Sequence, residues 1–170
     1  MFATFRRDDR GVAAVEFALV GSLFVGVLFN VAEVSRYAYL STQVTASSQA
    51  AAQAAIVKCS TSQIPVATNC PGVLATVTMA LQGSSLGSHV VLVGGLQEGW
   101  YCVNNAGALL RMSDAATKPT NCAAAGDATA SAALYLKVNA SYPFQPMFPG
   151  LTIVESFPAN ISRAAWMRLA

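Results

Sequence analysis

The hydrophobic pattern of the chain is dominated by one uninterrupted apolar stretch near its N-terminus. From Gly11 to Val34 the sequence is GVAAVEFALVGSLFVGVLFNVAEV, and between Phe17 and Ala32 no residue carries a charge. At about 1.5 Å per residue, a helix over residues 12–34 is roughly 34 Å long, which exceeds a hydrocarbon core of about 30 Å. The pattern therefore predicts a transmembrane helix over residues 12–34.

A single acid, Glu16, lies near the start of this span. The Val, Leu and Phe residues of the span favour insertion by roughly 4–8 kcal/mol at about 0.3–0.6 kcal/mol each. A charged carboxylate costs about 2.5–3.5 kcal/mol at mid-membrane and less near an edge. Insertion is therefore favoured, and an acid that is kept at such a cost is a candidate functional residue.

The helical pattern continues beyond the apolar span. After Arg36 the chain is rich in alanine and contains no Gly or Pro until Pro65. One long helix is expected from about Val12 to Val57, and two helices with a bend near Arg36 are the alternative. Asn30 and Glu33, at the outer end of the span, either extend a packing face or meet water.

The remaining sequence shows shorter patterns. Residues 133–142 alternate with period two and predict a strand, whereas residues 73–81 fit a strand or a helix. Strands are also expected at 88–93 and 99–103, separated by a turn at Gly94-Gly95. We expect an exposed loop over 114–129 and a final hairpin from residues 151–157 and 160–169.

The predicted fold class is α+β, with a long N-terminal hydrophobic helix followed by a small antiparallel β-sheet domain with disulfides. Four segments are expected: residues 1–11 as a basic leader, 12–34 as a transmembrane segment, 35–58 as a continuation of the helix, and 59–170 as a periplasmic or extracellular domain.

Four cysteines all follow the apolar span: Cys59, Cys70, Cys102 and Cys122. An even number on one side of a membrane indicates disulfides in an oxidising compartment. Three pairings are open, and Cys59–Cys70 with Cys102–Cys122 is preferred because both loops are short and rich in turn residues. A zinc site built from all four thiolates is the alternative.

The net charge and the absence of catalytic motifs argue against two classes of function, nucleic-acid binding and catalysis. The net charge of +2 is far from the basic excess of a nucleic-acid-binding protein. The chain has no GxSxG, HExxH or P-loop motif, and its one histidine, His89, falls in an expected apolar strand. We therefore expect a non-catalytic protein with no cofactor and no metal.

The N-terminal residues set the expected orientation. Arg6, Arg7 and Arg10 precede the span, and the positive-inside rule keeps this end in the cytoplasm. The chain after about Val34 is then translocated. An ordinary signal peptide is the alternative for the same stretch.

The basic leader, Gly11 and the run VAAVEFALV resemble the N-terminus of TadE-like proteins, the minor pilins or pseudopilins of the tight-adherence (Tad/Flp) type IV pilus system. The run EVSRYAYLSTQVTASSQAAAQAA and the later YPFQPMFPG are similar as well. The resemblance implies that a prepilin peptidase cuts between Gly11 and Val12. Glu16 then becomes the fifth residue of the mature chain, with Phe17 beside it.

The charges of that motif could pair between neighbouring subunits of a filament. Cleavage would expose an ammonium at Val12, and Glu16 of one subunit can pair with the ammonium of a neighbour in a filament. An acid left unpaired in an apolar bundle is costly, so the pairing would set axial register. A plain single-pass anchor, with the acid reaching the membrane surface, is the alternative.

The resemblance implies a role in pilus biogenesis, filament initiation or the filament tip, or adhesion. The implied partners are the prepilin peptidase, the major Flp pilin, another TadE/TadF-type minor pilin and the bacterial inner membrane, with no nucleic acid. The alternative function is a single-pass, membrane-anchored periplasmic binding module that is neither processed nor assembled.

Overall fold

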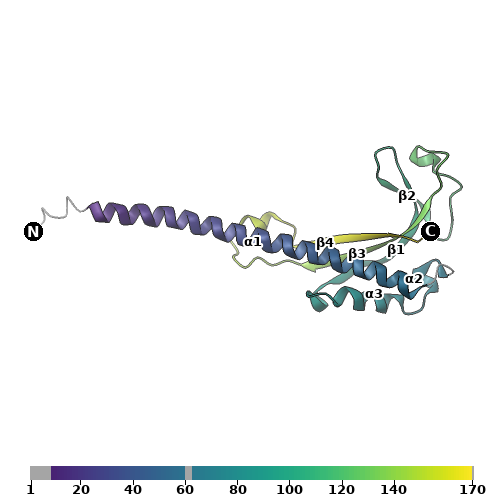
Figure 1. The fold of residues 1–170 in the computed structure, drawn as a ribbon, viewed down its shortest axis with the longest axis horizontal. Coiled ribbons are helices and arrows are strands. Elements are labelled where there is room, and N and C mark those ends of the chain that lie inside the picture. The colour runs from purple at the N-terminus through teal and green to yellow at the C-terminus, as the bar shows by residue number, and fades with distance from the viewer. Residues whose placement is uncertain (1–8, 60–62, 170) are drawn as a thin grey trace, which may run out of the picture. The chain divides into compact units, whose positions relative to one another are not determined.

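The computed structural model describes residues 9–59 and 63–169. The chain forms two compact units. One contains the chain up to Tyr39 together with Phe144–Ala159, and the other contains Leu40–Pro143 together with the last residues from Asn160. Helix α1 is continuous over Asp9–Lys58, which confirms the single long helix expected from the sequence (Figure 1).

The first half of α1 is a free apolar surface. An 18-residue window of this helix reaches a mean hydropathy of 2.3, and none of that window is buried in the protein. A core helix of a globular protein would bury such residues. The helix is therefore long and apolar enough to cross a membrane, and its surface is open to lipid or to other helices.

The second unit is built on one antiparallel sheet with strand order β2-β1-β3-β4. The strands are β1 (Val91–Val103), β2 (Leu109–Asp114), β3 (Ala133–Pro143) and β4 (Asn160–Arg168) (Figure 1). The helices of this unit are α2 (Val66–Asn69) and α3 (Val73–Gln82), with short 3₁₀ turns at Gly87–His89 and Ala123–Ala125. The predicted α+β class is confirmed.

Alternation along β3 builds the core of this unit. Every second residue of the strand is fully buried: Leu134, Leu136, Val138 and Ala140. Helix α3 contributes Val73, Val77 and Leu81, which are spaced four residues apart and therefore share one face. The second half of α1 buries Val44, Ala51 and Ala55 in the same way.

Several expected elements differ in the structure. The two strands expected at 88–93 and 99–103 are one strand, β1, because Gly94 and Gly95 adopt positive φ angles of 73° and 67° within a bulge rather than a turn. His89 therefore lies outside any strand, exposed in a 3₁₀ turn and 6.5 Å from the ring of Tyr142. Residues 73–81 form a helix.

The C-terminal expectations also need correction. No hairpin forms over residues 151–169, because Ile153–Ser156 is a 3₁₀ turn of the first unit and only β4 belongs to the sheet. Strand β2 was not expected at all. The exposed loop expected at 114–129 is confirmed in its main features: after the end of β2 these residues form turns, bends and one 3₁₀ turn, with a bridge between Cys122 and Asp127.

All four cysteines are paired in disulfides, Cys59–Cys70 and Cys102–Cys122, with Cα–Cα separations of 5.8 and 5.7 Å. The preferred pairing is therefore the one found, and no thiolates remain for the zinc alternative. The second disulfide lies in a buried cluster with Ala125 and Ala132, against which Trp100 and Met112 pack.

Asp127 orders the loop beside that disulfide. Its carboxylate accepts hydrogen bonds from the Thr129 hydroxyl at 2.7 Å, the Thr129 amide at 2.8 Å and the Ala130 amide at 3.2 Å. These bonds, the Thr129 hydroxyl first, lower the pKa of Asp127 because they favour its charged form.

Glu98 ties the sheet to α2. Its carboxylate is almost fully buried and accepts the amide N–H groups of Val66 at 2.8 Å and Ala67 at 2.6 Å. Two charge-assisted hydrogen bonds of this kind compensate the burial of the acid. An acid that carries no motif in the sequence is thus a structural link within the second unit.

Candidate functional site

The residues expected at the processing site lie on the exposed start of α1. Val12 is 60% exposed and Phe17 is 80% exposed, and a Cβ built on Gly11 would meet no atom within 4 Å. The Glu16 side chain is also exposed. The structure therefore places Gly11, Val12, Glu16 and Phe17 within two turns of one helix, without covering any of them.

Glu16 makes no hydrogen bond or ion pair with any side chain that the structure describes. The exposed valine, leucine and phenylalanine side chains around the Glu16 carboxylate cannot compensate its charge. Its partner, if it has one inside a membrane or a filament, must come from outside residues 11–59 and 63–169.

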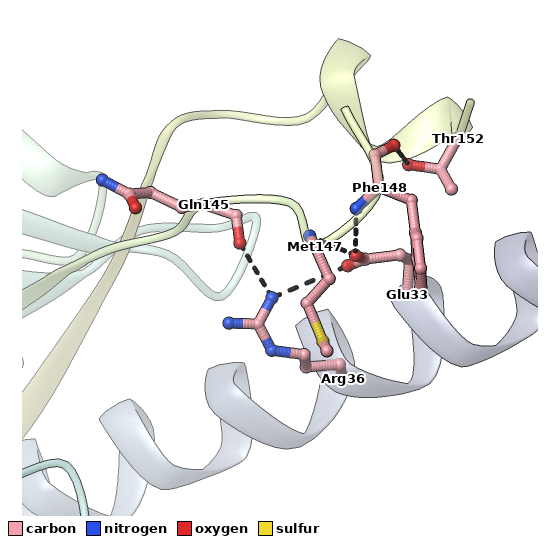
Figure 2. Close-up of polar contacts among 6 residues, drawn as sticks. All are labelled: Glu33, Arg36, Gln145, Met147, Phe148 and Thr152. Carbon is pink, nitrogen blue, oxygen red and sulfur yellow. Dashed lines mark hydrogen bonds and ion pairs between the residues drawn. The ribbon is translucent and has the colours of Figure 1, made fainter. Parts of the chain in front are cut away.

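A second polar site lies at the other end of the apolar span. Glu33 is only 1% exposed, and one of its oxygens, Oε1, accepts the backbone N–H groups of Met147 and of Phe148, the latter at 3.2 Å (Figure 2). Its other oxygen, Oε2, lies 3.7 Å from the guanidinium of Arg36. We call Phe144–Ala159, which supplies these amides, the clasp segment.

Arg36 contacts both Glu33 on α1 and the clasp segment. Its Nη1 donates a hydrogen bond of 2.8 Å to the carbonyl of Gln145, and its guanidinium lies 5.2 Å from the ring centre of Phe144 (Figure 2). Within the described residues, Oε2 of Glu33 accepts no hydrogen bond, so Arg36 is the group that compensates this oxygen. A buried carboxylate without these donors would be strongly destabilising.

Asn30, one turn before Glu33, uses its side chain in the same way. Its Oδ1 accepts the Ile153 N–H at 2.9 Å, and its Nδ2 donates to the carbonyls of Gly26 at 2.9 Å and Leu151 at 3.5 Å. The two polar residues at the outer end of the span therefore both bind the backbone of the clasp segment. Of the two expectations for them, the packing face is the one found.

Aromatic contacts complete the attachment. Phe29 stacks on Phe148 with ring centres 4.4 Å apart, and Tyr37 meets the edges of Phe144 and Phe157 at 5.1 and 4.9 Å. The clasp segment thus binds about two turns of α1, from Phe29 to Tyr37. Its role escaped the sequence analysis because Glu33 and the Met147 amide are 114 residues apart in the chain.

Comparison with known proteins matches the part of α1 that carries residues of both sites. Residues 11–53 match the family model of TadE-like protein. This TadE-like segment includes Gly11, Val12, Glu16 and Phe17, as well as Asn30, Glu33 and Arg36, and it agrees with the resemblance found in the sequence. The clasp segment lies outside it.

No curated protein and no solved structure matches the chain. This match covers residues 11–53 alone, so it shows a likeness of the N-terminal helix to TadE-like protein. Together with one apolar helix of membrane length, it is consistent with a membrane-anchored protein.

Proposed function

We propose that this protein is a non-catalytic minor pilin, or pseudopilin, of a Tad/Flp type IV pilus. In this proposal residues 12–34 anchor it in the bacterial inner membrane, with the N-terminus in the cytoplasm and the second unit in the periplasm. The observation that supports it most is the TadE-like segment, whose apolar 18-residue window has no buried residue and whose Glu16 has no partner among the described side chains.

The mechanism would begin with cleavage between Gly11 and Val12 by a prepilin peptidase. The new ammonium at Val12 and the carboxylate of Glu16 would be about one helical turn apart, roughly 6 Å along the axis. In a bundle of parallel helices, Glu16 of one subunit would pair with Val12 of the next. Because an unpaired charge in that bundle is expensive, the pairing would fix the axial position of each subunit.

The proposed partners follow from this arrangement. They are the prepilin peptidase, the major Flp pilin and another TadE/TadF-type minor pilin, each presenting an apolar helix or acting on one. The role would lie in pilus biogenesis, at filament initiation or at the tip, or in adhesion. None of these roles requires a catalytic group.

The first prediction tests processing. Protein extracted from the membranes of cells with an active prepilin peptidase should have lost residues 1–11 and should begin at Val12. Intact-mass spectrometry measures this directly, and cells that lack the peptidase provide the control in which Met1 is retained. Retention of Met1 in both strains would contradict the proposal and would favour an unprocessed, membrane-anchored binding module.

The second prediction concerns Glu16→Ala. The variant should still insert, because the substitution removes an acid from an apolar span, but it should fail to assemble. Loss of one partner of a buried ion pair costs about 3–5 kcal/mol, enough to abolish a register contact. Crosslinking in membranes, followed by pull-down and detection of the major pilin, measures this loss.

Asp114→Ala is the matched control, since it removes an exposed acid whose one ion pair, with Arg111, is local. The control should retain wild-type crosslinking. Normal piliation and crosslinking in Glu16→Ala would show that Glu16 has no pairing role.

A further inference from the structure

The clasp segment descends along α1 and returns. Phe144 and Gln145 contact Tyr37 and Arg36, the next residues bind Glu33 and Phe29, and Phe157 is back at Tyr37. Figure 2 shows the chain passing from Gln145 over Arg36 to Phe148 and Thr152 near Glu33. The part closest to the apolar half of α1 is therefore residues 147–153, which we call the clasp tip.

The level of the clasp tip can be estimated from the helix rise. If α1 enters the hydrocarbon core near Val12, about 20 residues cross it, so the core ends near Ala32. Asn30, which binds the backbone of Leu151 and Ile153, then lies roughly 3 Å inside this boundary. Tyr37, which contacts both ends of the clasp segment, lies roughly 8 Å outside it.

The clasp tip presents three large apolar side chains to the outside. Met147 is 63% exposed, Leu151 63% and Ile153 62%, although their backbones are fixed by Asn30 and Glu33. The backbones of Leu151 and Ile153 contact Asn30, so these residues lie at the outer end of the exposed apolar span of α1, in the same unit. An exposed apolar group on an otherwise well-bonded segment indicates an interaction site.

The charge of the segment fits a lipid surface. Glu155 is the only ionisable residue among residues 144–159, and its carboxylate accepts the N–H of Gly150. An acid at the edge of a bilayer, with a hydrogen-bond donor and access to water, is tolerated far better than one at the centre. Asn30 and Glu33 are shielded by the clasp segment itself.

We propose that the clasp tip inserts into the outer leaflet, so that Met147, Leu151 and Ile153 contact lipid acyl chains beside α1. This inference depends on the proposed membrane anchoring of α1. The occupant is lipid because the tip lies where α1 leaves the hydrocarbon core and continues its lipid-facing surface. The clasp tip then acts as a second, shallow anchor that holds α1 at a defined depth.

The test uses the full chain in vesicles of phosphatidylcholine and phosphatidylglycerol. Leu151→Cys and Ala159→Cys each receive an environment-sensitive fluorophore on the new thiol, since all native cysteines are in disulfides. Ala159 is the matched shallow control, because its carbonyl binds the amide of Phe144 at the level of Tyr37. Leu23→Cys, on the exposed apolar half of α1, reports insertion of the helix itself.

Spin labels near the headgroup end of the lipid acyl chains should quench the emission at position 151 strongly and that at position 159 weakly, whereas spin labels deeper in the acyl chains should quench position 23. Ile153→Cys should repeat the result of Leu151→Cys at an independent position. Equal quenching at 151 and 159, or a blue shift at 151 without quenching by lipid, would overturn the inference, the second by indicating a protein partner. An unquenched label at position 23 would instead contradict the membrane anchoring of the proposed function.

Discussion

Glu33→Ala should release the clasp segment from α1. The substitution leaves the amides of Met147 and Phe148 without an acceptor and Arg36 without its carboxylate. Each buried amide that is left without an acceptor costs about 1–3 kcal/mol, and the guanidinium of Arg36 loses its counter-charge as well, so the attachment of the clasp segment is strongly weakened. Hydrogen exchange measured by mass spectrometry should show much faster exchange in peptides that cover residues 144–159.

Two other variants make this result specific. Glu33→Gln keeps an oxygen that can accept the two amides but loses the charge that faces Arg36, so its exchange should be intermediate. Glu155→Ala removes an exposed acid of the same segment that binds the Gly150 N–H, and it should leave exchange at Met147 and Phe148 unchanged. If Glu33→Ala exchanged like the wild type, Glu33 would not be the residue that holds the clasp segment.

Glu33→Ala should also change the depth of α1 in the proposed membrane. Once the clasp segment is released from Glu33→Ala, the Asn30 side chain loses its hydrogen bonds to Leu151 and Ile153 at the outer boundary of the apolar span. Replacing satisfied polar groups with unsatisfied ones at this depth is unfavourable, so α1 would have to shift outward to hydrate them. In this variant, attachment of the clasp segment and the depth of α1 are therefore coupled through Asn30.

Removal of the Cys102–Cys122 disulfide by Cys102→Ala with Cys122→Ala should strongly destabilise the second unit. The bond joins residues 20 positions apart, for which loop closure alone corresponds to about 3.3 kcal/mol. Both sulfurs are also buried in the cluster with Ala125 and Ala132, so a cavity adds to the loss. Urea unfolding followed by tryptophan fluorescence measures the change, since Trp100 packs against this cluster.

Cys59→Ala with Cys70→Ala is the matched comparison. Its residues are 11 positions apart, which corresponds to about 2.8 kcal/mol, and it should therefore destabilise the unit slightly less. Both losses should fall in the range of about 2–5 kcal/mol that is typical of small exported domains. If removal of the Cys102–Cys122 disulfide lowered the free energy of unfolding by less than about 1 kcal/mol, the cluster would keep its geometry without the bond.

Glu33 and Glu98 show how this chain uses isolated acids. Each is buried and accepts two consecutive amide N–H groups, and in both cases the first amide directly follows a proline, Pro146 or Pro65. Glu33 lies within the TadE-like segment and Glu98 lies outside it, and neither acid has a regular spacing to another acid. Sequence analysis can find such residues but cannot identify the backbone that they hold.

The sequence by itself predicted the long helix and the β3 strand and favoured the disulfide pairing that is found, because each depends on residues that are close together in the chain. Continuous apolar residues without a helix breaker specify α1, strict alternation specifies β3, and short turn-rich loops favour the two bonds found. Only the tertiary structure decided that Gly94-Gly95 is a bulge and that residues 144–159 attach to α1. Their conformation depends on β3 and on Glu33, which are distant in sequence, and local preferences carry no information about such partners.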